Sequence, residues 1–360
     1  MYCGSRKTGR CDEEDINIMD KRYYVSAMDC WTGRVDSEDD YDAFRWHQWV
    51  KPLDLNEDNK PFKGKLAFGI VGFCSEQGVQ RNKGRVGTAL APDFIRKQMS
   101  NLPCSFSEKV EIYDAGNILC QEISMEEGQR MLGEAVEKIL DLNLFPIVLG
   151  GGHETTFGHF QGQFNSIKMK GKKPDIGIVN FDAHFDLRPY DKGSSSGSMF
   201  RQIYDICMEE GCKYGYLPLG IQQHSNTVSL FKKAKEIGVN YVLARMFQYG
   251  STASVLEKID TFMYGHKDAY ITICTDVFSS AFAPGVSATQ SLGLDPEVVI
   301  PMIKHILRTR KVRGFDICEI SPRFDQDNTT ANLGAVIIFS VVNTLCKLHG
   351  LGLTMEGDIF

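Results

Sequence analysis

The sequence predicts an α/β fold in which a parallel sheet is covered by helices on both faces. Two observations support this prediction. Short apolar runs recur along the chain without polar alternation, as they do in strands that are buried on both sides. Amphipathic stretches of helical period lie between several of these runs. Strands and helices that alternate in this way are typical of a parallel sheet between two helical layers.

Eight apolar runs are predicted to form the strands of this sheet. They are short and bounded by turn residues, as buried strands usually are. In chain order they span residues 66–73, 109–116, 144–150, 175–181, 214–220, 239–244, 269–275 and 313–320.

Three stretches are predicted to be amphipathic helices. They are residues 125–141, 228–237 and 297–309. The first shows the pattern most clearly, because its apolar residues recur at helical spacing along one face. These residues are Met131, Leu132, Ala135, Val136 and Leu140.

The chain is interpreted as one domain with an N-terminal extension. Residues 1–22 are polar and are predicted to be a disordered tail. Residues 23–65 are rich in charged and aromatic residues and are predicted to be an arm that packs on the main body. Residues 66–350 are predicted to form the single domain. The Gly/Ser run at 193–198 lies inside the strand pattern, so we interpret it as a loop.

The composition narrows the classes of function. The 360 residues carry a net charge of −6, which does not favour binding to nucleic acid or to a membrane surface. No apolar run reaches the roughly 20 residues that span a bilayer, and the N-terminus lacks the apolar core of a signal peptide. The 11 cysteines are scattered, as free thiols in a reducing compartment are. We expect a cytoplasmic protein that acts on a small molecule.

The strongest candidate site follows the strand predicted at 175–181. Asp182, His184 and Asp186 alternate with period two there, so their side chains can point the same way. Oxygen and nitrogen ligands of this kind suit a divalent metal of intermediate hardness such as manganese. The alternative is a polar strand end that caps backbone groups. Without a cation, however, such a cluster would repel or titrate.

Two further strand ends carry candidate metal ligands. Three glycines turn the chain after one strand and present His153 at the same edge of the sheet, where we expect a ligand rather than a loop histidine. Asp276 ends another strand, and Cys274 lies two residues before it on the same side. For Cys274 a ligand and a small buried core residue remain equal alternatives.

Glu319 closes the last predicted strand. A carboxylate at this position can bind a cationic amidinium group through two parallel hydrogen bonds. The alternative is a helix cap or a surface acid.

Together these motifs resemble those of the ureohydrolase family, which contains the arginases and agmatinases. The family motifs are GGGHE, DAHFD, TD followed by FAPG, and DICEISP. Other segments resemble the formimidoylglutamase branch of this family. They are WTGRVDSEDDYDAFRWHQ, CSEQGVQRNKGRVGTALAPD, SGSMF, GIQQHSNT, and APGVSA followed by FDQDNTTANL. The resemblance covers about residues 31–346.

The resemblance implies a three-layer α/β/α fold around a mainly parallel sheet of eight strands. It also implies two manganese ions that share a bridging hydroxide. His153 and Asp186 would bind one ion, and His184 and Asp276 the other. Asp182 would bridge both.

The resemblance further implies hydrolysis of N-formimidoyl-L-glutamate to L-glutamate and formamide. Glu319 would face the formimino group. As a mechanistic hypothesis, Asp186 carries the proton to the leaving amine, because a ligand carboxylate has a second oxygen free. Arg188 is the first candidate for binding substrate carboxylates. Ser196, Asn226 and Arg85 lie in loops that could contribute.

The chain departs from the general family pattern at two positions. Cys274 stands where the family has a bridging carboxylate, so the occupancy of one metal position is in doubt. Phe200 stands where arginases have a histidine, which argues against arginase activity. Agmatinase or guanidino-acid hydrolase activity remains one alternative, and a weakly metallated, non-catalytic protein is the other.

Two expectations concern regulation and assembly. Cys74 and Cys274 are both predicted at the carboxyl edge of the sheet, so a disulfide between them is a redox hypothesis. The alternative is two unrelated buried thiols. A homo-oligomer is expected from the resemblance, with the arm at 23–65 as one source of contacts.

Overall fold

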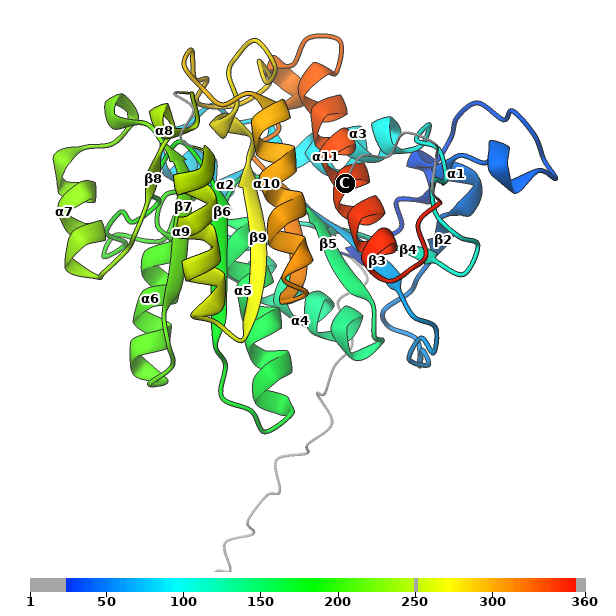
Figure 1. Cartoon of the computed structure of the whole chain (residues 1–360), viewed down its shortest axis with the longest axis horizontal. Helices are drawn as coiled ribbons and strands as arrows, with labels where there is room; N and C mark the ends of the chain where they lie inside the picture. Colours follow the sequence, from blue (N-terminus) through cyan, green and yellow to red (C-terminus); the bar gives the residue numbers. More distant parts are fainter. Residues whose placement is uncertain (1–23, 249–251, 354–360) are drawn as a thin grey trace, which may run out of the picture.

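A ten-stranded sheet forms the centre of the protein (Figure 1). This computed structural model describes residues 24–248 and 252–353, so the tail predicted over 1–22 lies outside the described residues. The sheet order is β1-β4-β3-β5-β10-β9-β6-β7-β8, with β2 paired to β4. The strands are β1 (Tyr24–Val25), β2 (Lys51–Pro52), β3 (Ala67–Cys74), β4 (Glu111–Leu119), β5 (Phe145–Leu149), β6 (Ile176–Phe181), β7 (Gly215–Ile221), β8 (Val242–Leu243), β9 (Asp268–Cys274) and β10 (Val312–Cys318).

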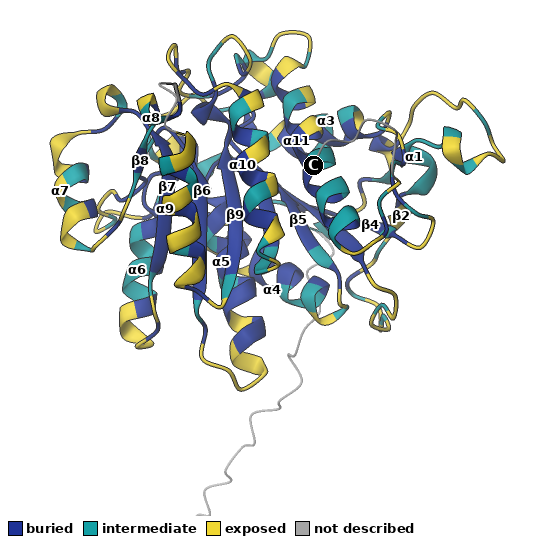
Figure 2. Cartoon of the chain, in the orientation of Figure 1, coloured by how far each residue is buried: buried dark blue, intermediate teal, exposed yellow. Residues whose placement is uncertain are grey.

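All eight predicted strands are confirmed, as β3 to β10, and they pair in parallel. The two further strands are two residues long and lie beside β4: β1 pairs with it antiparallel and β2 parallel. The parallel strands are buried on both faces, as Figure 2 shows. That burial explains why their sequences are apolar throughout instead of alternating.

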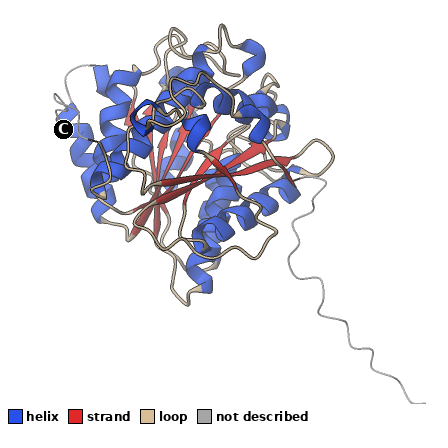
Figure 3. Cartoon of the chain, turned by 90° about the vertical axis from the view of Figure 1, so that its right-hand side faces the viewer, coloured by secondary structure: helices blue, strands red, loops and turns tan. Residues whose placement is uncertain are grey.

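Helices cover both faces of the sheet (Figure 3). Residues that alternate along a strand belong to different core clusters, as Val179 and Ile178 on β6 do. One layer contains α3 (Ala91–Met99), α9 (Thr252–Tyr264), α10 (Pro296–Arg308) and α11 (Thr329–Leu348). The other contains α4 (Met125–Asp141), α5 (Thr155–Met169), α6 (Met199–Glu209) and α7 (Val228–Glu236). Short helices are α1 (Trp46–Trp49), α2 (Gln77–Arg81) and α8 (Arg245–Gln248).

The three predicted helices are confirmed as α4, α7 and α10. Helix α5 has no counterpart among them, and its environment explains why. It packs on the sheet and against the neighbouring helices α4 and α6, so ten of its residues are buried and the polar face that would mark a helical period is nearly lost.

Helix α11 is also apolar over most of its length. It is the one helix in the described part of the chain that is long and apolar enough to cross a membrane by length and composition. Half of its most apolar window is buried inside the protein, where it packs on α3 and α10.

A buried ion pair attaches residues of the 23–65 region to the sheet. Arg96 on α3 donates from Nε to Asp114 Oδ2 at 2.6 Å and from Nη2 to Oδ1 at 3.0 Å, and both side chains are almost fully buried. The third donor is Trp31, whose indole reaches Asp114 Oδ2 at 2.6 Å. Arg96 also donates to Asn117 Oδ1 at 2.6 Å. One carboxylate therefore links α3, β4 and the segment that precedes β2.

We predict that Arg96→Ala lowers the free energy of unfolding by about 3–5 kcal/mol, because it leaves the buried Asp114 carboxylate without its cation. The measurement is the midpoint of urea unfolding. Arg130→Ala is the control, since Arg130 makes its ion pairs on the surface of α4 and should cost less than about 1 kcal/mol. Equal losses in the two variants would contradict this account of the Arg96 pair.

Candidate metal centre

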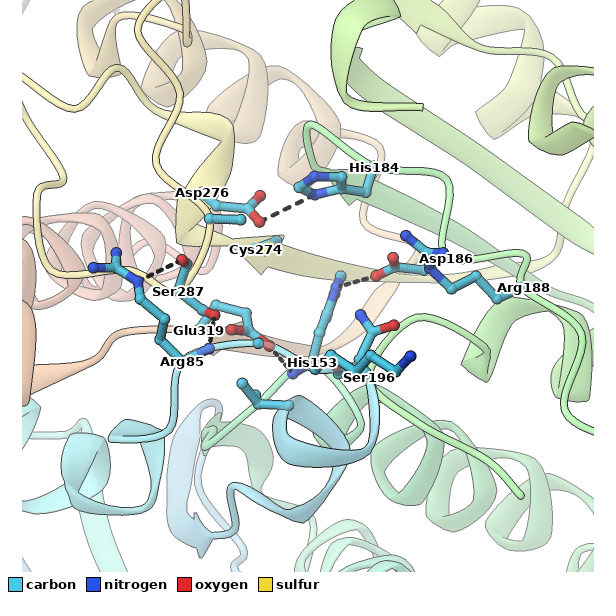
Figure 4. Close-up of a pocket in the computed structure, with 15 residues that line it drawn as sticks. Arg85, His153, His184, Asp186, Arg188, Ser196, Cys274, Asp276, Ser287 and Glu319 are labelled. Atoms are coloured by element: carbon cyan, nitrogen blue, oxygen red, sulfur yellow. Dashed lines mark hydrogen bonds and ion pairs between the residues drawn. The ribbon is translucent and has the colours of Figure 1, made fainter. Parts of the chain in front are cut away.

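A cavity of about 310 Å³ lies where four neighbouring strands end (Figure 4). The sheet order β5-β10-β9-β6 brings together the carboxyl ends of strands that are far apart in the chain. His153 follows β5, Asp182 follows β6, Cys274 ends β9 and Glu319 follows β10. Parallel α/β sheets bind their ligands at this edge.

Asp182, His184 and Asp186 converge, but not through the pleat of a strand as the sequence suggested. Strand β6 ends at Phe181, and the next residues form an irregular turn. Within it, Asp182 Oδ1 accepts from the backbone N–H of His184 at 2.7 Å. Asp186 adopts a left-handed conformation with φ 47°. This strained residue aims its carboxylate back at His153.

The glycine loop positions His153 by close packing and not by unusual backbone angles. None of the three glycines at 150–152 has a positive φ. A Cβ on Gly151 would lie only 1.9 Å from the carbonyl oxygen of Ser75, so no larger residue fits there. The loop can therefore lie directly against the end of β3, with His153 over the ends of the strands.

A hydroxyl group fixes the orientation of the His153 ring. Nε2 lies 3.1 Å from Thr272 Oγ1, and Thr272 Oγ1 lies 3.0 Å from Thr156 Oγ1. If Nε2 donates to Thr272, then Nδ1 presents its lone pair to the cavity, as a metal-binding histidine must.

Two overlapping groups of side chains could each hold a metal ion, and they share Asp182. One consists of His153, Asp182 and Cys274, and the other of Asp182, His184 and Asp276. His153 Nδ1 lies 3.0 Å from both Asp182 Oδ2 and Asp186 Oδ2. His184 Nδ1 lies 3.1 Å from Asp276 Oδ2 and 3.4 Å from Asp182 Oδ1. The shared carboxylate is the arrangement that a pair of ions requires.

The pKa values of the acids and histidines in this cluster indicate that it favours bound positive charge. Burial opposes charge on His153 and His184, yet the surrounding carboxylates raise the pKa of both well above the ordinary value. Burial and the neighbouring Asp182 raise the pKa of Asp186 to about 6. Asp276 Oδ1 is buried and has no hydrogen-bond partner among the described residues. Carboxylates, neutral imidazoles and an unused buried oxygen fit divalent cations, which would replace the histidine protons.

Glu319 lies at the same end of the cavity in a left-handed conformation, φ 67°. Its Oε1 accepts from the backbone N–H of His153 at 2.8 Å, which fixes the carboxylate in place. Burial raises the pKa of Glu319 to about 8, and the charges of Glu154 and Asp276 add to this effect. A cationic group in the cavity would reverse that direction, because it favours the charged carboxylate.

The arginines that line the cavity are exposed, whereas its acids are buried. Arg188 and Ser196 both line it, as predicted. Arg85 lines it too, but its guanidinium is held by the carbonyl oxygens of Ser287, at 3.0 Å, and Val286, at 2.7 Å. The cavity therefore has an acidic floor and a basic rim, which suits a ligand that is cationic at one end and anionic at the other.

A family model places this geometry among known proteins. The model described as the arginase family matches residues 66–343. The chain belongs to the arginase family. All four strand ends that carry the acids and histidines of the cavity lie inside the matched segment.

Relatives within the arginase family are similar over nearly the whole chain. A formimidoylglutamase of Clostridium tetani (strain Massachusetts / E88) is 58% identical over 333 residues, which cover 92% of this chain and 98% of that protein. The crystal structure of formimidoylglutamase from Bacillus subtilis has a TM-score of 0.73 at 20% identity, covering 89% of this chain and 98% of the other. A Trypanosoma cruzi formiminoglutamase with Mn²⁺ has a TM-score of 0.68 at 22% identity, covering 78% and 94%. These likenesses confirm the predicted arginase-type fold.

Two predictions about individual residues are wrong. Asn226 was expected to bind substrate, but its amide is used within the protein fold. It donates to the carbonyl oxygens of Ala183 and Gln222, both at 2.8 Å, and accepts from the N–H of Phe185 at 3.0 Å. It lines no part of the cavity. Its role is to hold the Asp182–Asp186 turn against the loop after β7.

The disulfide hypothesis for Cys74 and Cys274 is also wrong. Strands β5 and β10 lie between the two strands that carry these residues. Three strand spacings amount to roughly 14 Å, about twice the Cα separation that a disulfide allows. Both thiols are buried, and burial raises the pKa of Cys74 to about 12. Burial and nearby carboxylates raise the pKa of Cys274 as well, which opposes the reactive thiolate form.

Several residues that line the cavity or orient its side chains were not identified from the sequence. Thr272 lies inside an apolar strand. No sequence signal indicates that its hydroxyl contacts a histidine far away in the chain. Asn82, Lys83 and Ser287 line the rim. They lie in segments that resemble the formimidoylglutamase branch, so the segments were identified but the individual residues were not.

We predict that Cys274→Asp raises the affinity of the protein for manganese at least tenfold. Cys274 belongs to one of the two groups that could hold a metal ion, and a carboxylate is a harder donor than a thiol. Metal bound per chain, measured by mass spectrometry after dialysis against graded manganese, checks this. The control is Cys274→Ala, which removes the donor. A Cys→Asp change elsewhere, for example at Cys207, is unsuitable because Cys207 lies in the core. Equal manganese content in Cys274→Asp and Cys274→Ala would contradict a ligand role at this position.

Proposed function

We propose that this protein hydrolyses N-formimidoyl-L-glutamate to L-glutamate and formamide, with manganese, as a step of histidine degradation. The observation that carries the proposal is the polarity of the cavity: an acidic floor suits a formimino group, and a basic rim suits carboxylates. The 58% identity to a protein named formimidoylglutamase supports it. Water adds to the formimino carbon, the bond to the glutamate nitrogen breaks, and a proton goes to that nitrogen.

The residues that would hold manganese are those of the two overlapping groups together with Asp186, which contacts His153. His153 and Asp186 would bind one ion, His184 and Asp276 the other, and Asp182 both. Cys274 would contribute a thiol where the family pattern has a carboxylate. When bound, such a metal pair lowers the pKa of a water molecule and makes hydroxide available near neutral pH.

Glu319 would orient the substrate. Its carboxylate is fixed by the His153 amide and faces the cavity beside the metal ligands. Two parallel hydrogen bonds from an amidinium would satisfy both oxygens and place the carbon over the cluster. The positive charge also stabilises the ionised form of Glu319, so binding and ionisation support each other.

Asp186 would move the proton. Its backbone is held in the left-handed region, which fixes the carboxylate beside the cavity. Its Oδ2 contacts His153, which leaves Oδ1 for a proton that passes to the leaving nitrogen.

The basic rim also bears on related substrates. Agmatine carries a second cation where Arg188 and Lys83 line the cavity, so like charges would oppose its binding. A guanidino acid would bring a carboxylate to the same place and belongs in the substrate panel. The proposed setting is the cytoplasm, with a homo-oligomer as the proposed assembly.

The proposal predicts metal-dependent turnover. Chelator-treated protein should lose activity and regain it with manganese better than with zinc or magnesium, because the donor set mixes oxygen and nitrogen. The assay measures glutamate release from N-formimidoyl-L-glutamate, with agmatine and 4-guanidinobutyrate alongside and bound metal determined in parallel. If fully metallated protein hydrolyses none of the three substrates, the non-catalytic alternative is supported. If metal-free protein keeps full activity, the metal-dependent mechanism is wrong.

Glu319→Gln should retain manganese and lower kcat/KM roughly 100-fold, equivalent to about 3 kcal/mol of transition-state stabilisation. The variant keeps the shape of the side chain but loses the charge that pairs with the amidinium. Glu108→Gln, at an exposed position, is the control and should behave as the wild type. A rate close to wild type in Glu319→Gln, with metal content unchanged, would show that another group orients the substrate.

A further inference from the structure

The turn that follows α2 forms part of the cavity rim. Asn82, Lys83 and Gly84 all line the cavity, close in sequence to Arg85. Lys83 and Arg188 are exposed there, and neither side chain makes a hydrogen bond or ion pair with any described residue. Arg85 differs, since it is bound by two carbonyl oxygens and stacks on Phe324 at 4.1 Å. Two unpaired cations therefore face a cavity whose floor is acidic.

The backbone at Lys83 is unusual for a lysine. Helix α2 ends in a Schellman motif, in which Gly84 N donates to Val79 O at 2.8 Å and Lys83 N donates to Gln80 O at 3.0 Å. The motif places Lys83 in the left-handed region, with φ 63°. Glycine is the usual residue at this position, because a Cβ is disfavoured there. A strained residue that lines a cavity is a reason to look for a function of its side chain.

Asn82 and Arg188 approach each other over Gly197. A Cβ on Gly197 would lie 3.1 Å from Asn82 Nδ2, 3.0 Å from Arg188 Nε and 2.8 Å from Arg188 Cδ. Glycine at this position therefore lets the Arg188 side chain and the Asn82 amide nitrogen pack directly against the backbone, so that the two groups lie close together. Ser196, the preceding residue, lines the same side of the cavity. Neighbouring donors of this kind at a cavity rim suit a carboxylate.

We propose that the Asn82–Lys83 turn determines specificity for a substrate with two carboxylates. Asn82 and Arg188 bind one carboxylate over Gly197, and Lys83 binds the second. This inference rests on the proposed function, because N-formimidoyl-L-glutamate has one cationic end and two carboxylates. Its consequence is that the second carboxylate contributes to binding through Lys83 and not only through the general charge of the rim.

The test compares two substrates that differ only at the second carboxylate. N-formimidoyl-L-glutamine replaces it with an amide of nearly the same shape. In manganese-loaded wild type, kcat/KM should favour the glutamate derivative. In Lys83→Gly this preference should fall at least tenfold, the loss expected for one charge-assisted pair. The melting temperature should stay equal or rise, because glycine relieves the left-handed backbone. Lys83→Arg should retain most of the preference.

Arg310→Gly is the matched control. Arg310 occupies the same position after α10, with φ 58° and its N–H donating to Leu307 O at 3.0 Å, and it lines no part of the cavity. It too is a left-handed cation, and its change to glycine should leave the substrate preference at the wild-type value. A preference that Lys83→Gly leaves intact, or that Arg310→Gly reduces equally, overturns the proposal.

Product binding separates this inference from the proposed function. The Kd values of L-glutamate and L-glutamine for the metal-loaded protein can be measured by calorimetry, whether or not the protein hydrolyses the formimidoyl derivatives. The inference requires that wild type prefers glutamate and that Lys83→Gly loses the preference. If wild type hydrolyses neither substrate, the proposed function fails, while the binding result still decides the role of Lys83.

Discussion

The burial of several carboxylates in one place is the constraint on which this structure depends. Asp182, Asp186, Asp276 and Glu319 converge with two histidines in an interior that disfavours charge. Protons on the histidines balance part of that charge, and divalent cations would balance it with the same ligands. The acidic floor of the cavity therefore favours binding of positive charge, from a metal ion or from an amidinium.

Holding such groups together requires a rigid backbone, and the sheet supplies it. Four adjacent parallel strands end at the cavity, and the residues that leave them adopt constrained conformations. Asp186 and Glu319 are left-handed, and Gly151 packs within a distance that no side chain would permit. The cost of these conformations is met by the surrounding core, which is apolar on both faces of the sheet.

The sequence predicted the strands and the acid and histidine positions because both leave local signals. Apolar runs marked β3 to β10, and the motifs DAHFD and GGGHE marked the ends of β6 and β5. Contacts between distant segments left no such signal. Nothing in the sequence shows that the Asn226 amide forms hydrogen bonds with backbone groups, or that two strands separate Cys74 from Cys274. Helix α5 was not predicted, because it is buried on most sides and its sequence therefore shows little amphipathic periodicity.

The position of β10 in the sheet affects how the site assembles during folding. This strand is the last in the chain, yet it lies in the middle of the sheet, between β5 and β9. While the protein is being synthesised, the ribosome releases β5, β6 and β9 before β10 exists, so the sheet remains split where the cavity will form. Pairing across this gap spans long sequence separations and is slow to form. A chain truncated before residue 312 therefore keeps every residue of the two candidate metal groups, but it lacks the strand that joins β5, and with it His153, to the ends of β6 and β9.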